Sequence, residues 1–579
     1  MPELKTVWGE NLNPEAILPE YPRPQLVREN YVNLNGRWDY AITASDAEPE
    51  HWDGEILVPF SPEAPLSGVN RTLLPGQTLW YRREIAEMRR KGQRLLLHFG
   101  AVDQEAKIYV NGKLAGAHLG GYTAFTVELT EFLTDGPSVL TVAVRDGTDT
   151  NEYCRGKQKT KRGGIWYTPQ SGIWQTVWLE SVPEVYVKSL RITPEFDEAR
   201  VRIELETALE SSAAITCDVR AADGSFVAGS WAKGGVCVIP LPGFRAWTPD
   251  DPYLYTLDIT CGEDRVESYF AMRKFSYVEL DGHKVFGLNN APLFHNGLLD
   301  QGYYPDGLLT PPSDEAMVND IETMKRCGFN MLRKHIKIEP LRWYYHCDRL
   351  GMIVWQDMVS GGQPYSFLHV SALPTLGKVD LPDQDAKPYG RRGVLSRARF
   401  RREMADTVRL LYNCPCIALW TVFNEGWGQF DALDMANELK KLDPTRFIDH
   451  ASGWQDQGYE EMKSRHIYFR PVKLKNDGRA LALTEYGGYI LAVDGHRWTD
   501  KVFGYRICRD SAALAHDYEK LMLGQVLPHI RKEGLTAAVY TQITDVEEEL
   551  NGLMTYDREV LKIPEETLRE INAALRFDT

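Results

Sequence analysis

Short apolar segments separated by turn residues fill the first third of the chain. Residues 95–99 form one such segment, and residues 107–110 and 113–114 flank the dipeptide Asn111-Gly112. Asn-Gly between two apolar runs is a strong signal for a two-residue β-hairpin. We therefore expect residues 1–182 to form an all-β domain.

A second β region is expected from residue 183 to residue 276. Val201, Ile203 and Leu205 alternate with charged residues, which is the period of a strand with one buried face. Asp223-Gly224 supplies a turn. A length of about 90 residues is typical of a small immunoglobulin-like β-sandwich. Because no Gly/Ser linker separates the two β regions, we expect them to pack directly on each other.

From about residue 277 onward, strand patterns alternate with helix patterns. Ser313 can cap a helix in which Met317, Ile321 and Met324 lie on one face, and Gly328 follows the end of this helix. Eight strand-length segments can be counted, at residues 285–293, 329–332, 352–355, 417–422, 447–449, 466–468, 481–484 and 535–542. Eight strands in about 300 residues predict a (β/α)8 TIM barrel over residues 277–579, with its active site at the C-terminal ends of the strands.

Composition and charge narrow the class of protein. The chain has 579 residues, of which 43% are hydrophobic and 25% charged, as in ordinary globular proteins. Its net charge of −15 argues against nucleic acid or an anionic membrane as the main partner. No apolar stretch approaches the ~18 residues of a membrane span, and the N-terminus lacks a secretory signal pattern. We therefore expect a cytoplasmic protein.

The nine cysteines do not show the paired spacing of a zinc site or a disulfide framework. The closest pair, Cys414 and Cys416, lies beside an apolar run with no second pair to complete a metal site. We expect reduced cysteines in the core, no metal site and no cofactor.

Two glutamates follow predicted barrel strands. Glu425 comes after the strand at residues 417–422 and is followed by Gly426-Trp427, and Glu485 comes directly after the strand at residues 481–484. A single glutamate in such a position is usually a solvated loop residue. A pair in one barrel mouth is suited to glycoside hydrolysis, in which one carboxyl group protonates the leaving oxygen and the other attacks the anomeric carbon or activates water.

With these residues in place, the chain resembles glycoside hydrolase family 2, the family of β-galactosidases and β-glucuronidases, over nearly its whole length. The first domain resembles the jelly-roll sugar-binding domain of this family through five motifs: Leu34-Asn35-Gly36-Arg37-Trp38, Trp80-Tyr81-Arg82-Arg83, Val110-Asn111-Gly112-Lys113, Gly120-Gly121-Tyr122 and Ser171-Gly172-Ile173-Trp174-Gln175. The middle domain fits the family's immunoglobulin-like module by position and size. The resemblance implies that Glu425 is the acid/base and Glu485 the nucleophile of a retaining glycosidase.

The resemblance implies roles for four further residues. Arg333 matches an arginine that lies near the nucleophile, Tyr468 matches a tyrosine that hydrogen-bonds it, and Asn424 is expected to reach the sugar 2-hydroxyl. His335 follows Arg333-Lys334 directly, one residue earlier than in the usual family pattern Arg-x-Ser-His. It is therefore a weaker match.

Other candidates come from loops expected at the mouth. His295 and Asp300 are placed after strand one, Asp357 after strand three and Asp545 after strand eight, and Trp427 offers an aromatic face for a sugar. Each of the four polar residues is also compatible with an ordinary structural role.

The expected sugar is neutral. β-Glucuronidases of the family resemble one another in an Asn-x-Lys element that binds the substrate carboxylate, whereas the comparable stretch here is Asn551-Gly552-Leu553-Met554. We therefore expect a β-galactosidase-like exo-glycosidase, with β-glucuronidase, β-mannosidase or arabinosidase-type activity as alternatives. A uronide would need another cation, such as Lys334 or Arg497.

A catalytically inert carbohydrate-binding protein is the alternative from another class, and the presence of both glutamates argues against it. The expected partner is a carbohydrate substrate, with neither nucleic acid nor membrane. Whether the chain forms a homo-oligomer is left open.

Overall fold

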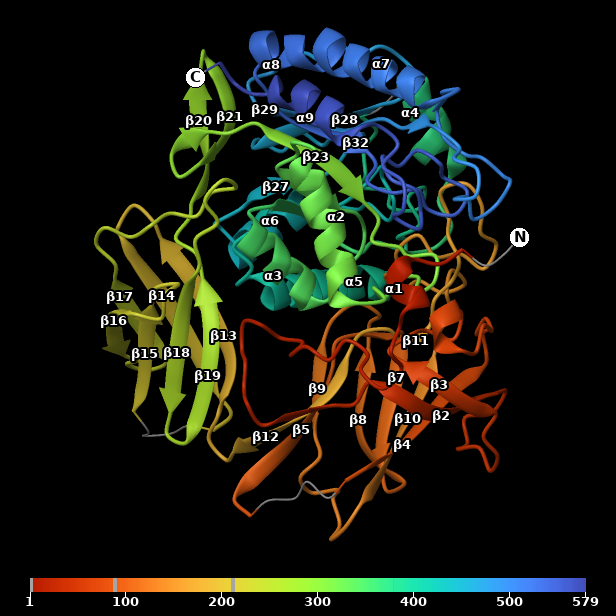
Figure 1. The fold of residues 1–579 in the computed structure, drawn as a ribbon, viewed down its shortest axis with the longest axis vertical. Coiled ribbons are helices and arrows are strands. Elements are labelled where there is room, and N and C mark those ends of the chain that lie inside the picture. The colour runs from red at the N-terminus through yellow and green to blue at the C-terminus, as the bar shows by residue number, and fades with distance from the viewer. Residues whose placement is uncertain (1–3, 87–90, 210–213, 378–379, 579) are drawn as a thin grey trace.

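The computed structural model describes residues 4–86, 91–209, 214–377 and 380–578. Figure 1 shows two β-sandwiches, one drawn in orange and one in yellow to green, beside a larger body of parallel strands and helices that runs from green to blue. A short helix, α1 (Val7–Glu10), lies near the N-terminus.

The first sandwich has two main sheets, and its core lies between them. One sheet has the order β1 (Tyr31–Asn33), β12 (Val177–Pro183), β5 (Gln93–Phe99), β9 (Phe125–Glu128). The other has the order β3 (Gly54–Val58), β2 (Gly36–Thr43), β4 (Thr78–Ile85), β10 (Ser138–Arg145), β7 (Glu105–Val110), β8 (Lys113–Leu119). A small pair, β6 (Val102–Asp103) with β11 (Gly172–Ile173), and a 3-10 turn at Pro65–Ser67 complete the sandwich.

The predicted hairpin is present. Asn111 and Gly112 join β7 to β8 with positive φ angles of 51° and 75°, the conformation that this turn requires.

The second sandwich also has two sheets, which enclose an apolar core. Their orders are β13 (Val187–Glu195), β14 (Arg200–Thr207), β17 (Val236–Pro240) and β16 (Phe226–Trp231), β15 (Ile215–Arg220), β18 (Tyr255–Cys261), β19 (Asp264–Phe270). Val201 and Ile203 are buried as the alternation predicts, while Leu205 is half-buried. Gly224, with a φ of 82°, makes the predicted turn between β15 and β16.

The third body is an eight-stranded parallel barrel whose strands follow one another in chain order. They are β23 (His295–Asp300), β24 (Met331–Lys334), β25 (Ile353–Asp357), β26 (Ile417–Thr421), β27 (Phe447–Asp449), β28 (Met462–Ile467), β29 (Ala480–Gly487) and β32 (Leu535–Thr541). No ladder joins β27 to β28 in the described residues, but the Ser464 hydroxyl donates to Asp449 across this gap at 3.0 Å.

Helices and short strands surround the barrel. The helices are α2 (Asp314–Arg326), α3 (Leu341–Leu350), α4 (Leu373–Thr375), α5 (Val394–Leu411), α6 (Ala432–Leu442), α7 (Ser511–Leu521), α8 (Leu527–Glu533) and α9 (Glu565–Ala573), with π-helical segments at Leu368–Ala372 and Met522–Val526. A further pair of strands is β30 (Tyr489–Ile490) with β31 (Arg506–Ile507). The Ser313 hydroxyl accepts from Ala316 N at 3.2 Å, so it caps α2 as predicted.

The predicted opening strand at residues 285–293 is wrong. That stretch forms β21 (His283–Leu288), which pairs antiparallel with β20 (Phe275–Leu280) and β22 (Ala291–Pro292). The small sheet packs its apolar face on residues at the beginning of the barrel strands and closes that end of the barrel. The first barrel strand is instead β23, a stretch that the sequence pattern assigns to a loop. Strand β20 includes residues on both sides of the predicted domain boundary between residues 276 and 277. The domain limits therefore stay a prediction.

Buried ion pairs between side chains join the two sandwiches. Arg28 Nη1 lies 3.0 Å from Glu180 Oε2 of β12, and Arg28 Nε lies 2.9 Å from Asp264 Oδ1 of β19. All nine cysteines are buried and unpaired. Among the described residues, no helix combines the length and apolar character needed to cross a membrane.

Candidate active site

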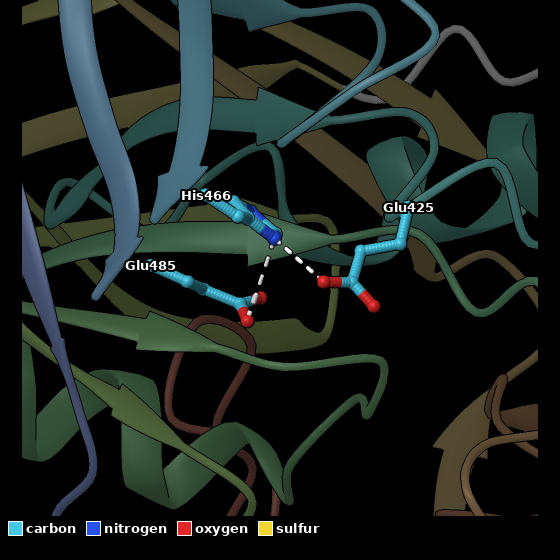
Figure 2. Close-up of side chains that lie close together, drawn as sticks. All are labelled: Glu425, His466 and Glu485. Carbon is cyan, nitrogen blue, oxygen red and sulfur yellow. Dashed lines mark hydrogen bonds and ion pairs between the residues drawn. The ribbon is translucent and has the colours of Figure 1, made fainter. Parts of the chain in front are cut away.

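Glu425 and Glu485 meet at the open end of the barrel. Glu485 lies within β29, and Glu425 lies in the loop that follows β26. Glu425 has a φ of 52°, and its backbone N–H donates to Ser452 O at 3.0 Å. One oxygen of each carboxyl group and one ring nitrogen of His466 all lie within 4.8 Å of one another. Figure 2 shows both carboxyl groups turned toward the edge of the His466 ring.

Arg333 of β24 is the cation of this site and is fully buried. Its guanidinium donates from Nη1 to Glu485 Oε1 at 3.1 Å, from Nη2 to Asn424 Oδ1 at 2.8 Å, and to both carboxylate oxygens of Asp357 at 3.0 Å. The sequence placed Arg333 after its strand, but it is part of the strand, and its inward direction follows from the pleat. Arg333 thus fixes the positions of Glu485, Asn424 and Asp357 together.

Tyr468 contacts the other oxygen of Glu485. Its hydroxyl donates to Glu485 Oε2 at 2.6 Å and lies 2.9 Å from Thr541 Oγ1. The Tyr468 ring stacks on Tyr505 with centroids 3.9 Å apart. The geometry therefore places Tyr468 where the sequence expected it, beside the predicted nucleophile.

His466 was not among the predicted site residues. Its Nδ1 lies 2.8 Å from Glu425 Oε1 and 3.5 Å from Glu485 Oε2. A signal for it was present, because residues two apart on a strand share a face and His466 precedes Tyr468 by that interval.

A hydrogen-bond chain holds the ring of His466 from its other side. His466 Nε2 lies 3.2 Å from the Ser452 hydroxyl, which donates to Thr484 Oγ1 at 3.0 Å. The two ring nitrogens therefore contact Ser452 on one side and Glu425 on the other.

Burial raises the pKa of Glu425 to about 7, although the cations Lys157 and Arg333 oppose the rise. Burial also raises the pKa of Glu485, against the effects of His466, Arg333 and Tyr468. Burial thus outweighs the ion pair with Arg333, although the charge of Arg333 by itself lowers the pKa of Glu485. Burial lowers the pKa of His466 to about 4, which keeps its ring neutral near pH 7.

His335 and Asp357 lie beside this centre. His335 Nδ1 is 2.8 Å from Asp357 Oδ2, and the His335 ring lies 6.4 Å from the ring of Trp427. Trp427 in turn stacks with Tyr365, with centroids 6.1 Å apart, and approaches Trp166 at 5.1 Å. These rings form an aromatic wall next to Glu425.

Three other predicted residues make their contacts elsewhere. His295 lies at the beginning of β23 and accepts from Trp355 Nε1 at 3.0 Å, at the closed end of the barrel. Asp300 binds Lys334 Nζ at 2.6 Å, and Asp545 binds Lys562 Nζ at 2.6 Å. The loop assignment of His295 and Asp300 was wrong because both belong to a buried strand. Among the contacts of the described residues, none joins these three residues to either glutamate, so their substrate roles stay a prediction.

Part of the wall comes from the first sandwich. The 154–168 loop, defined as residues 154–168 between β10 and β11, contacts the segment after β32: Thr168 N donates to Glu547 at 2.8 Å, and the Tyr167 hydroxyl donates to Glu549. The charge of Glu549 adds to the raised pKa of Glu425. Sequence reasoning missed this loop.

In the part of the chain that the structure describes, two groups of side chains have the spacing of metal ligands, namely the Glu425, His466 and Glu485 set and a second set of His496, Asp557 and Glu559. In the first set, the fixed positive charge of Arg333 beside Glu485 disfavours a bound cation. In the second, Asp557 already accepts from Thr555 at 2.6 Å.

Comparison with known families agrees with the fold and the site. The sugar binding domain model of glycosyl hydrolases family 2 matches residues 68–183, a second model of that family matches residues 185–273, and its TIM barrel domain model matches residues 311–474. The chain therefore belongs to glycosyl hydrolase family 2, a family of hydrolases.

Curated relatives carry more than one activity in their names. The chain is 26% identical to a beta-galactosidase of Thermoanaerobacter pseudethanolicus over 63% of this chain and 47% of that protein. It is 25% identical to a beta-glucuronidase of Bacteroides fragilis over 62% of this chain and 52% of that protein. The chain thus spans about half the length of the curated relatives it matches.

Solved structures share the whole fold. A beta-glucuronidase from an uncultured Clostridium sp. superimposes with a TM-score of 0.74 at 18% identity, covering 95% of this chain and 99% of that one. A GH2 beta-galacturonidase from Eisenbergiella tayi bound to galacturonate gives 0.70 at 19% identity, covering 96% and 99%.

Proposed function

We propose that this protein is a retaining exo-β-glycosidase that acts on terminal β-linked sugars. The spacing of the two carboxyl groups carries the proposal, since oxygens of Glu425 and Glu485 lie within 4.8 Å of each other. Retaining glycosidases hold their carboxyl groups about 5–5.5 Å apart, whereas inverting enzymes leave about 6.5–9.5 Å for a water molecule.

Glu485 is the proposed nucleophile. Donors from Arg333 and Tyr468 hold both of its oxygens, which fixes the carboxylate and favours its ionised form. It attacks the anomeric carbon and forms a covalent glycosyl-enzyme as the glycosidic bond breaks.

Glu425 is the proposed acid/base. It gives its proton to the leaving oxygen in the first step, and in the second it takes a proton from the water that hydrolyses the glycosyl-enzyme. A pKa of about 7 suits both roles near neutral pH.

Asn424 is the proposed partner of the sugar 2-hydroxyl. Its Oδ1 accepts from Arg333 at 2.8 Å, so the orientation of the amide is fixed and Nδ2 is turned toward other acceptors. A hydrogen bond to the 2-hydroxyl strengthens in the transition state of glycoside hydrolysis.

NMR of the first-formed sugar anomer tests the reaction. A retained β-configuration is expected on the best of a set of 4-nitrophenyl β-glycosides. An inverted product would show that water, and not Glu485, attacks the anomeric carbon.

The contacts in the site constrain the identity of the sugar less than they constrain the type of reaction. A β-galactoside is the proposal from sequence, and a β-glucuronide is the alternative that the names of the relatives support equally. The two cations that the sequence offered for a uronide are engaged: Lys334 with Asp300, and the half-buried Arg497 with Asp494 at 3.0 Å. Catalytic inactivity is not proposed, because both carboxyl groups occupy one site.

A further inference from the structure

Lys157 extends from the 154–168 loop of the first sandwich into the mouth of the barrel. Its side chain is 7% exposed. Its Nζ atom lies 5.7 Å from the ring centroid of Trp427 and 5.6 Å from that of Tyr167. Trp427 is the aromatic residue two positions after Glu425, the proposed acid/base.

The electrostatics of the mouth agree with this position. After burial, the positive charge of Lys157 has the largest influence on the pKa of Glu425, which it lowers. The same charge also lowers the pKa of His335, on the neighbouring strand end. Lys157 is therefore near enough to Glu425 and to His335 for its charge to act on both.

Among the described residues, Lys157 differs from the other buried lysines in having no anionic partner. Each of the others has a carboxylate within hydrogen-bond distance: Lys334 with Asp300 at 2.6 Å, Lys337 with Glu339 at 2.7 Å and Lys562 with Asp545 at 2.6 Å. Within the described ranges, Lys157 Nζ makes neither an ion pair nor a hydrogen bond, and its only contacts of this kind are the two aromatic rings. Buried charges are normally paired, which implies that the partner arrives with the ligand.

We propose that Lys157 binds a carboxylate of the substrate, so that the site selects an acidic glycoside. This inference rests on the proposed glycosidase function and names the substrate class of the same site. It reverses the expectation of a neutral sugar, which rested on the absence of a lysine in residues 551–554. In this proposal, the cation comes from the 154–168 loop and not from residues 551–554.

Glu549 restricts the position of this carboxylate. It accepts from the Tyr167 hydroxyl and from Asn551 Nδ2 at 3.4 Å, and it acts on Glu425 from the segment after β32. A second carboxylate would be repelled there, whereas sugar hydroxyls can donate to it. The acidic group of the substrate must therefore lie on the Lys157 side, and Glu549 is suited to a hydroxyl.

Two kinds of glycoside carry such a group, one with a uronic acid as the sugar and one with a carboxylate on the aglycone. Matched pairs separate them. The first pair is 4-nitrophenyl β-D-galacturonide and β-D-galactoside, repeated with the glucuronide and glucoside. The second pair is 4-carboxyphenyl and 4-carbamoylphenyl β-D-galactoside, which differ in charge on the aglycone alone.

We expect kcat/KM to be higher for the acid than for the neutral partner in one of these pairs, by about tenfold to a hundredfold, as is typical of a hydrogen bond to a charged group. Preference for the uronides places the carboxylate on the sugar, and preference for the carboxyphenyl glycoside places it on the aglycone. Measurements on the wild-type enzyme are enough to decide whether the carboxylate lies on the sugar or on the aglycone.

Lys157→Met removes the charge and keeps most of the side-chain volume. It should lower the ratio of kcat/KM for the acidic partner to kcat/KM for the neutral partner by about tenfold or more. Lys157→Arg should keep the preference. Lys161→Met is the matched control, because Lys161 is exposed on the same loop, and it should change neither substrate. Thermal unfolding midpoints of the variants check that each one folds.

Equal kcat/KM for both members of every pair, or an equal loss for both in Lys157→Met, would overturn the inference. Turnover of neutral β-glycosides with retention would then leave the proposed function intact. The absence of turnover on all β-glycosides would overturn the proposed function itself.

Discussion

Two buried carboxyl groups in one site need different surroundings if one is to hold a proton and the other a charge. Glu485 accepts from a guanidinium and a phenol, at 3.1 and 2.6 Å. Glu425 lies 2.8 Å from the neutral ring of His466, and burial raises its pKa to about 7, which favours its protonated form near neutral pH. The donors and acceptors around each carboxyl group thus explain which one is proposed as the nucleophile and which as the acid/base.

Substitution of the two glutamates should give different results. Glu485→Gln removes the proposed nucleophile and should abolish turnover of all substrates. Glu425→Gln should spare the first step for substrates with good leaving groups such as dinitrophenol, and azide should restore part of the turnover, because azide attacks without a general base. Steady-state rates with and without azide, together with the anomeric configuration of the glycosyl azide, provide the measurement. Azide rescue of Glu485→Gln alone would mean that the roles are exchanged.

The pH profile should report on the contacts of Glu425. The acid must be protonated, so kcat/KM should fall as the pH rises through its pKa of about 7. Lys157→Met removes a cation that favours the ionised form, so the alkaline limb should move to higher pH. An alkaline limb that stays in place in Lys157→Met would show that the charge of Lys157 does not act on Glu425.

At the scale of elements, the loop after β27 supports the proposed active site through a glycine. Gly453 has a φ of +92°, and a Cβ atom there would lie 2.5 Å from His466 Nδ1. Only a residue without a side chain lets this loop pass so close to the ring. The loop therefore fixes the ring that contacts Glu425.

Gly453→Ala should displace His466 and lower kcat/KM by about tenfold or more, because small misplacements of catalytic groups are costly. Gly458→Ala is the control, since Gly458 has a φ of +82° but nothing within 4 Å of its Cβ position. Both variants should lose about 1 kcal/mol of stability through backbone strain. Equal activity of the two variants would show that the His466 position does not matter.

Several elements were predictable from local pattern and several were not. β26 and β27 were placed correctly because apolar runs followed by polar residues mark buried parallel strands. The run at residues 285–293 has the same local character, yet it belongs to the closing sheet, because periodicity alone does not tell one buried strand from another. The chemistry around Glu485 was predicted by resemblance. His466 was missed although the period of its strand indicates its direction.

At the scale of the whole molecule, buried ion pairs hold the two sandwiches together. Arg28 contacts Glu180 and Asp264, and all three side chains are at most 5% exposed. Breaking a buried pair leaves a charge without its partner, which costs more than the pair contributes when intact.

Arg28→Met should therefore lower the free energy of unfolding by about 3–5 kcal/mol. Arg37→Met is the control, since Arg37 pairs with Glu55 on the surface at 3.3 Å and should cost less than about 1 kcal/mol. Chemical denaturation followed by tryptophan fluorescence measures both. A loss in Arg28→Met no larger than in the control would show that the junction does not depend on this cation.

Lys157 shows why sequence patterns could not reveal the full site. It lies in a loop of the first sandwich, far along the chain from Glu425, and no periodicity or motif links the two positions. Only the packing of the 154–168 loop against the barrel brings the ammonium to Trp427.

The same arrangement has a consequence for how such proteins diverge. The groups proposed to break the bond lie on barrel strands and their loops, while the cation proposed to choose the substrate lies on a separate sandwich. Mutations in the 154–168 loop can therefore alter which glycans a descendant degrades, while purifying selection preserves the barrel. After gene duplication, changes in this loop could give one copy a new substrate specificity, while the hydrolysis reaction stays the same.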